Sequence, residues 1–115
     1  MDYSKMTDFE INRAVGDIAL HGKWACRPGT SGNDSDKWYY GNSDTSFNPL
    51  SALPDYCKNA ADAWPIITEN MIAIIPSTLK DGRWAAQAND WDYAHSNENP
   101  LRAAMIVYLQ LQEAK

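Results

Sequence analysis

The sequence has few cysteines and no long apolar run. Only two of its 115 residues are cysteines, Cys26 and Cys57. They form no Cys-x-x-Cys pair, which excludes a dense disulfide framework. The longest apolar run, residues 71–76, is far shorter than the roughly 20 residues that cross a bilayer. No basic-then-apolar signal segment opens the chain. We therefore expect a cytosolic protein with two free, reduced thiols.

Basic residues are also scarce. The chain has 10 Lys and Arg against 15 Asp and Glu, which gives a formal net charge of −5. Proteins that bind a nucleic-acid backbone present clustered Lys and Arg side chains, which release counterions from the phosphates. No such cluster is visible in the sequence, so direct nucleic-acid binding is disfavoured.

Residues that could ligate a metal are few and unpaired. Two thiols and two imidazoles are present, from His21, Cys26, Cys57 and His95. Structural zinc sites bring their ligands in close pairs, and no two of these four residues form such a pair. We therefore expect no metal and no cofactor.

No catalytic constellation is complete in the sequence. The acidic residue Asp62 fits a helix cap, and Asp90 and Asp92 fit a solvated surface. Nucleophilic catalysis by Cys57 would need a nearby histidine, which sequence distance neither shows nor excludes. These observations favour a non-catalytic protein and identify no catalytic residue.

Apolar and aromatic residues are abundant. They make up 44% of the chain and include five Trp, six Tyr and two Phe, which is ample material for one hydrophobic core. A chain of this length is typical of one domain. We therefore expect residues 1–115 to form a single domain.

Two segments carry clear signals for a helix start. Thr7 and Glu10 have the spacing of a capping box, and apolar residues follow at helical spacing as far as a plausible end at Gly22. Near the other end of the chain, Asn99 followed by Pro100 has the form of a helix cap. Because the segment after it is apolar nearly all round, we expect this last helix to be the central and most buried element.

A shorter helix is predicted between these two. It runs over residues 62–70, because Pro65 is best tolerated in a first turn, where its missing amide needs no partner. An earlier start at Asn59 would place a kink at Pro65.

The segments between the helices indicate strands, turns and an irregular connection. Residues 24–26 and 37–40 are aromatic runs expected to form a hairpin, with a mobile polar tip at 27–36. Residues 41–59 are expected to be an irregular connection. Residues 72–75 predict a strand buried on both faces, which returns through an Asp-Gly turn as 83–88. In that returning strand Trp84, Ala86 and Ala88 share the buried face, and the other face is partly wet. The whole pattern predicts an α+β fold, with three helices packed on one face of a small, mainly antiparallel sheet.

Three blocks of the sequence resemble the NinX proteins of lambdoid phages. They are residues 1–12 (MDYSKMTDFEIN), 61–70 (ADAWPIITEN) and 99–107 (NPLRAAMIV), which cover parts of all three predicted helices. The resemblance implies a single NinX-like domain, a phage or prophage origin, an accessory role and residence in the host cytoplasm. It carries over no catalytic residue.

Two groups of aromatic residues outside the helices together exceed what one sheet face can bury. The groups are Trp38, Tyr39 and Tyr40, and Trp84, Trp91 and Tyr93. Tyr and Trp are enriched at protein contacts, although core residues whose polar tips reach water explain the same pattern equally well.

Three functions remain open on this basis. The leading hypothesis is a non-catalytic protein that binds a host or phage protein through these aromatic residues, with self-association also open. The alternative is a small-ligand or nucleotide-binding domain in which the same aromatics stack on a base. A small hydrolase with an unrecognised site is the third.

Overall fold

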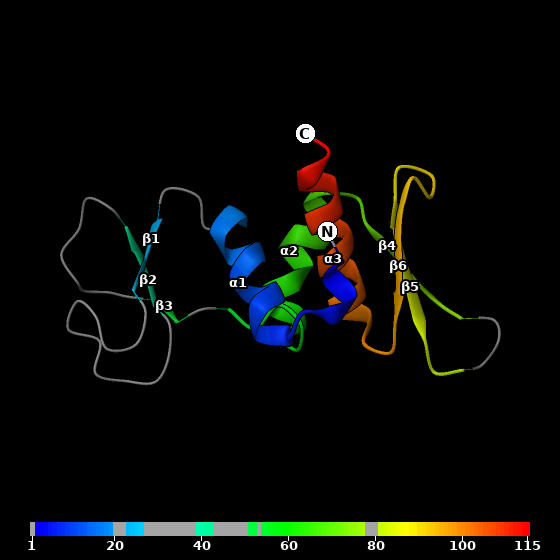
Figure 1. The fold of residues 1–115 in the computed structure, drawn as a ribbon, viewed down its shortest axis with the longest axis horizontal. Helices are drawn as coiled ribbons and strands as arrows, with labels where there is room; N and C mark the ends of the chain where they lie inside the picture. The colour runs from blue at the N-terminus through cyan, green and yellow to red at the C-terminus, as the bar shows by residue number, and fades with distance from the viewer. Residues whose placement is uncertain (1, 20–22, 27–38, 43–50, 53, 78–80) are drawn as a thin grey trace.

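The structure is a computed structural model in which three helices lie between two small antiparallel sheets (Figure 1). It describes residues 2–19, 23–26, 39–42, 51–52, 54–77 and 81–115, and in 23–26, 39–42 and 51–52 the description covers the backbone. The elements are the short 3₁₀ helix η1 (Tyr3–Lys5), α1 (Asp8–Ala19), β1 (Lys23–Cys26), β2 (Tyr39–Asn42), β3 (Ser51–Ala52), α2 (Ala60–Glu69), β4 (Ala73–Pro76), β5 (Trp84–Ala88), β6 (Tyr93–Asn97) and α3 (Pro100–Glu113).

Helix α3 is the middle layer of the core. It packs on β5 and β6 on one side and on α1 and α2 on the other. We call β4, β5 and β6 the C-terminal sheet, and β1, β2 and β3 the N-terminal sheet, which lies at the far end of the molecule (Figure 1). The predicted α+β class, with helices against an antiparallel sheet, is confirmed. The division of the strands into two separate sheets was not predicted.

The expected start of α1 is confirmed in atomic detail. The hydroxyl of Thr7 accepts a hydrogen bond from the Glu10 amide at 3.1 Å, and the Glu10 carboxylate accepts one from the Thr7 amide at 3.2 Å. These two bonds form the reciprocal capping box. The helix buries Ile11, Asn12 and Val15 against the core. The proposed stop at Gly22 lies outside the described residues.

Helix α2 begins earlier than the sequence suggested. The side chain of Asn59 caps the helix by accepting a hydrogen bond from the Ala61 amide at 3.0 Å. The predicted start at Asp62 was wrong, because its carboxylate instead accepts the amide of Asp55. Pro65 therefore lies inside the helix, where it gives up one backbone hydrogen bond on an exposed face.

Helix α3 matches its prediction closely. The Asn99 side chain accepts hydrogen bonds from the amides of Leu101 and Arg102, and Pro100 occupies the first turn. All seven residues from Ala103 to Leu109 are buried. No other described helix or strand has such a run, so α3 is the structural centre of the core.

The C-terminal sheet has the order β4-β5-β6, with both pairs antiparallel. The prediction that 72–75 forms a strand buried on both faces was wrong. β4 is an edge strand, and Ile75 is exposed on its open face. Pro76, which has no amide to donate, is tolerated at this edge. The turn before β5 is confirmed, with Gly82 at a φ of +78° and the Asp81 carboxylate accepting the amide of Arg83.

The N-terminal sheet contains the predicted hairpin and one additional strand. β1 and β2 pair antiparallel, with Cys26 opposite Tyr39. β3 pairs with β2 through Ser51 and Ala52, so the expectation that 41–59 is wholly irregular was wrong. The tip 27–36, predicted to be mobile, lies outside the described residues.

The end of α2 places a bulky residue in a left-handed conformation. The Ile72 amide donates to the Ile67 carbonyl at 3.0 Å, and the Met71 amide donates to the Thr68 carbonyl at 3.3 Å. This pair of bonds is a Schellman motif, which needs a left-handed residue after the helix and usually uses glycine. Here that residue is Met71, with a φ of 52° and 86% of its surface exposed.

Met105→Ala should lower the free energy of unfolding by roughly 2–5 kcal/mol, the usual cost of emptying a core position of this size. Met105 has no exposed surface and lies at the centre of α3. Urea unfolding followed by circular dichroism measures the change. A loss below about 1 kcal/mol would contradict the central place of α3.

Met71→Gly should raise the free energy of unfolding by about 0.5–1 kcal/mol, because glycine adopts a positive φ without a steric penalty. The matched control is Met71→Ala, which removes the same exposed side chain but keeps the β-carbon, and it should leave stability nearly unchanged. Equal stability of the two variants in urea unfolding would show that the backbone at Met71 is not strained.

Candidate functional site

The C-terminal sheet has one face against α3 and one outer face. The register places Trp84, Ala86 and Ala88 of β5 on the helix side, and Ala86 and Ala88 are buried there. The alternate residues of each strand therefore point outward. They are Ala73 and Ile75 of β4, Ala85 and Gln87 of β5, and Ala94 and Ser96 of β6. We call this surface the outer face.

Large apolar side chains are exposed on the outer face and at one of its ends. Ile75 lies on the face itself and is 38% exposed. Met71 and Trp91 precede β4 and β6 at the same end of the sheet and are 86% and 56% exposed. A cavity of about 270 Å³ lies beside Met71, lined by Met71, Gln87, Asn89 and Asp90. The mostly small side chains of the outer face and its exposed apolar rim together form a surface suited to protein contact.

The turn that carries Trp91 is held in an unusual backbone conformation. Asn89, Asp90 and Trp91 all have positive φ values, of 55°, 54° and 72°. The Asp92 amide closes the turn on the Asn89 carbonyl at 3.1 Å. The side chain of Gln87, on the outer face, accepts the Trp91 amide at 3.0 Å. A positive φ at a bulky residue costs free energy, so the turn presents Trp91 at the expense of stability.

The three predicted aromatic residues whose side chains are described, Trp84, Trp91 and Tyr93, do not converge on one site. Of those whose side chains are described, only Trp91 is exposed. Trp84 and Tyr93 are half-buried on the helix side of the sheet, and Tyr93 packs against the core. Trp38 and the side chains of Tyr39 and Tyr40 lie outside the described residues.

Sequence reasoning missed several exposed apolar side chains. Among them are Met71, Ile75 and Trp64, of which Trp64 is 60% exposed on α2. The exposure of Ile75 could have been predicted, because successive side chains in a strand point to opposite faces and Ile75 follows Ile74 in β4. For Met71 no sequence signal existed, since glycine is the usual mark of a left-handed helix end.

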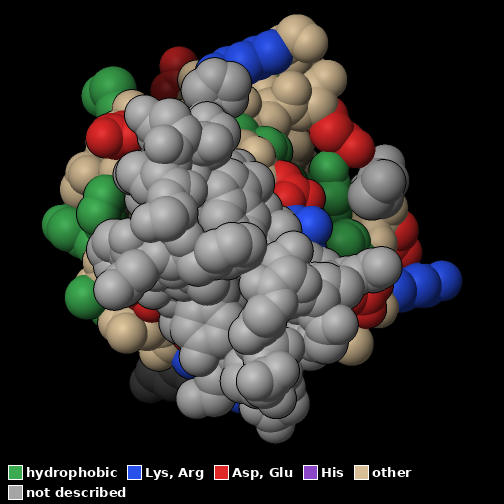
Figure 2. Space-filling model, turned by 90° about the vertical axis from the view of Figure 1, so that its left-hand side faces the viewer, with side chains coloured by type: hydrophobic (Ala, Val, Ile, Leu, Met, Phe, Trp, Pro, Cys, Tyr) green, Lys and Arg blue, Asp and Glu red, His purple; other side chains and the backbone are tan. Residues whose placement is uncertain are grey.

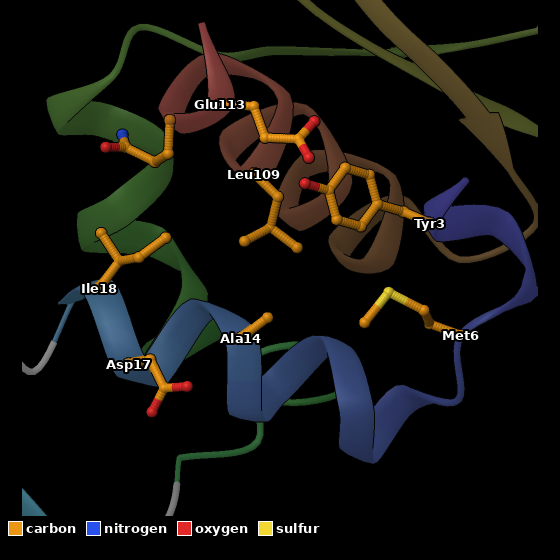
Figure 3. A pocket seen from close by; sticks show the side chains of 8 residues that line it. Tyr3, Met6, Ala14, Asp17, Ile18, Leu109 and Glu113 are labelled. Carbon is orange, nitrogen blue, oxygen red and sulfur yellow. The ribbon is translucent and has the colours of Figure 1, made fainter. Parts of the chain in front are cut away.

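A larger, apolar-walled cavity of about 440 Å³ lies between η1, α1 and the end of α3 (Figure 3). Tyr3 and Met6 line it from the N-terminal segment. Helix α1 contributes Ala14, Asp17 and Ile18, and α3 contributes Leu109, Gln112 and Glu113. We call it the α1–α3 cavity.

Tyr3 is the aromatic residue among the described residues that line this cavity, and it faces a carboxylate. Tyr3 is buried, and Figure 3 shows its side chain and that of Glu113 facing one another along α3. Burial and then hydrogen bonding and charge from Glu113 raise the pKa of Tyr3 to about 12, because ionisation would create a second negative charge there. Tyr3 therefore remains a neutral hydrogen-bond donor at physiological pH.

The structure describes two of the four candidate metal ligands, Cys57 and His95. Cys57 is a free, fully buried thiol, as expected, and its pKa is raised to about 12 by burial and by the nearby charge of Asp8. A thiol with such a pKa is a poor nucleophile. Within the described residues no three His, Cys, Asp or Glu side chains are grouped to hold a metal. His21 and the side chain of Cys26 lie outside the description.

The described surface mixes charges of both signs. Figure 2 looks at the end that carries the N-terminal sheet, where the visible Lys and Arg side chains are separated from one another and interspersed with Asp and Glu. Of the helices in the described ranges, none has the length and apolar character to cross a membrane.

His95 should make the folded protein less stable in mild acid. Burial, with Arg102 and Arg83 nearby, holds the pKa of His95 below 6.5, and its Nε2 is buried without a hydrogen-bond partner in the structure as described. The imidazole of His95 binds a proton more readily in the unfolded chain than in the folded protein. Neutral His95 therefore contributes its full share to the free energy of unfolding above pH 6.5. This share is lost as pH falls through the lower pKa that His95 has in the folded protein. Urea unfolding at pH 7 and pH 5 should show a larger loss for the wild type than for His95→Gln, and equal losses would contradict this role.

Comparison with known proteins places the chain in a family. A family model described as bacteriophage P22, NinX matches residues 2–112, nearly the whole sequence and all the described elements except the end of α3. The curated proteins and the solved structures gave no match. The resemblance of the three sequence blocks is thus confirmed by a match over the full fold, and the chain belongs to the bacteriophage P22 NinX family.

Proposed function

We propose that this phage accessory protein is a non-catalytic interaction domain that acts in the host cytoplasm. Its contact surface is the outer face of the C-terminal sheet, together with Met71 and Trp91 at its rim. The partner is a host or phage protein that presents a flat apolar patch bordered by basic side chains.

One observation carries this proposal: two large apolar side chains are exposed in backbone conformations that disfavour them. Met71 and Trp91 both have positive φ values and are more than half exposed. Folding alone gains nothing from either feature, since glycine or asparagine would form both turns with less strain. Strain that is kept at an exposed site is typical of functional surfaces.

The size and shape of the surface favour a protein partner. Its floor spans three strands and includes the small side chains of Ala73, Ala85 and Ala94. A flat floor with an aromatic and a methionine at its edge matches the make-up of protein contacts. A small ligand needs a concave site that surrounds most of its surface.

Charge at the rim indicates the chemistry of the partner. The exposed residues Asp90 and Asp92 lie on either side of Trp91 in the same turn, and the whole chain has a net charge of −5. A basic border on the partner would complement these carboxylates and speed association at low salt.

The alternative, stacking of a nucleotide base between aromatic residues, has less support. Trp84, Trp91 and Tyr93 line neither of the two cavities described above. Two of these three side chains face α3 instead of solvent.

The proposal is tested by capture from lysates of infected host cells, with identified partners compared between variants. The double variant Met71→Ala and Trp91→Ala should recover the specific partner at least about tenfold less than the wild type, because exposed aromatic anchors dominate contact energies. Trp64→Ala is the matched control. It removes an equally exposed Trp from α2 and should retain the partner.

Equal recovery by the wild type and the double variant would overturn the assignment of this surface. Absence of any reproducible partner would overturn the interaction function itself. Circular dichroism of each variant checks that the fold is intact.

A further inference from the structure

We propose that the α1–α3 cavity is a binding site for a small hydrophobic ammonium ion, such as an aliphatic primary amine in its protonated form. This site is separate from the outer face, because α3 lies between them (Figure 1). The inference therefore does not depend on the protein-contact function.

The walls of the cavity suit an aliphatic chain. Met6, Ile18 and Leu109 approach it from three different segments, and the small side chain of Ala14 leaves space between them (Figure 3). A volume of about 440 Å³ lies within the range of small-molecule sites. An alkyl group of several carbons would remove this apolar surface from water, and that burial is favourable.

The charged group at one side of the cavity selects a cation. The Tyr3 hydroxyl faces the exposed Glu113 carboxylate (Figure 3), which has roughly four acceptor positions. None of the described Lys or Arg side chains forms an ion pair with Glu113. The carboxylate therefore has acceptor positions for hydrogen bonds from an ammonium group.

The second carboxylate of the cavity has a different role. Asp17 pairs with Arg13 along α1, and Figure 3 shows its side chain directed away from Tyr3. Because none of the described Lys or Arg side chains lines the cavity, an anionic ligand would meet the Glu113 carboxylate without a described lining cation to offset it. A neutral ligand of the same shape would lose the charge-assisted hydrogen bond to Glu113.

Methionine methyl groups provide a built-in readout by carbon-13 NMR. Met6 lines the cavity, Met71 is exposed outside it, and Met105 is fully buried. Titration of the wild-type protein with hexylammonium should shift the Met6 methyl signal saturably and leave the other two unchanged. Met71 thus reports nonspecific binding, and Met105 reports disturbance of the core.

Selectivity for charge is the decisive measurement. We expect 1-hexanol to bind the wild type at least about tenfold more weakly than hexylammonium, as a lost charge-assisted hydrogen bond implies. The Glu113→Gln variant should bind hexylammonium and 1-hexanol with similar affinities. Glu69→Gln, which makes the same change on α2 outside the cavity, should preserve the preference, and Ala14→Phe should abolish binding by filling the space.

The proposal is overturned if hexylammonium produces no saturable shift of Met6. It is also overturned if 1-hexanol binds as tightly as hexylammonium, or if Glu113→Gln keeps the wild-type preference.

Discussion

The buried position of α3 depends on a polar junction at its first turn. A helix in the core leaves unpaired amides at its start, and each needs a partner away from water. Asn99 accepts two of these amides and donates to the Cys57 carbonyl at 2.6 Å. Arg102 binds the Asp8 carboxylate at 2.7 Å and also donates to the Met6 carbonyl. These two side chains thereby connect α3 to the N-terminal segment and to the segment that precedes α2.

This junction explains which parts of the fold could be predicted from the sequence. Thr7 and Asn99 act within a few residues of their own positions, so local spacing was enough to predict both helix starts. Whether a strand lies inside a sheet or at its edge depends on neighbouring strands that are distant in sequence. Local sequence therefore suggested that β4 is buried on both faces, whereas it is an edge strand. β6 was not predicted at all, because Tyr93–Asn97 alternates larger side chains with Ala and Ser and has no hydrophobic run.

The candidate sites were predictable only in part. Composition indicated more aromatic side chains than the core needs, and Trp91 is indeed exposed. Composition did not indicate which aromatic side chains face the core and which face solvent. For Trp84, however, the alternation along β5 already predicted a position beside Ala86 on the buried face. The α1–α3 cavity joins Tyr3 to Glu113 from opposite ends of the chain, and no local pattern relates residues so far apart in sequence.

Met71 and Trp91 connect stability with function on the outer face. Each needs a left-handed backbone, and each extends a large apolar side chain into solvent. Burial in the core, including seven consecutive residues of α3, contributes the free energy that offsets this strain. A rigid turn also presents Trp91 with little loss of backbone freedom on contact, which lowers the entropic cost of binding. Relief of the strain by glycine would therefore stabilise the free protein and weaken the proposed contact, the trade-off expected where an exposed side chain serves binding and not folding.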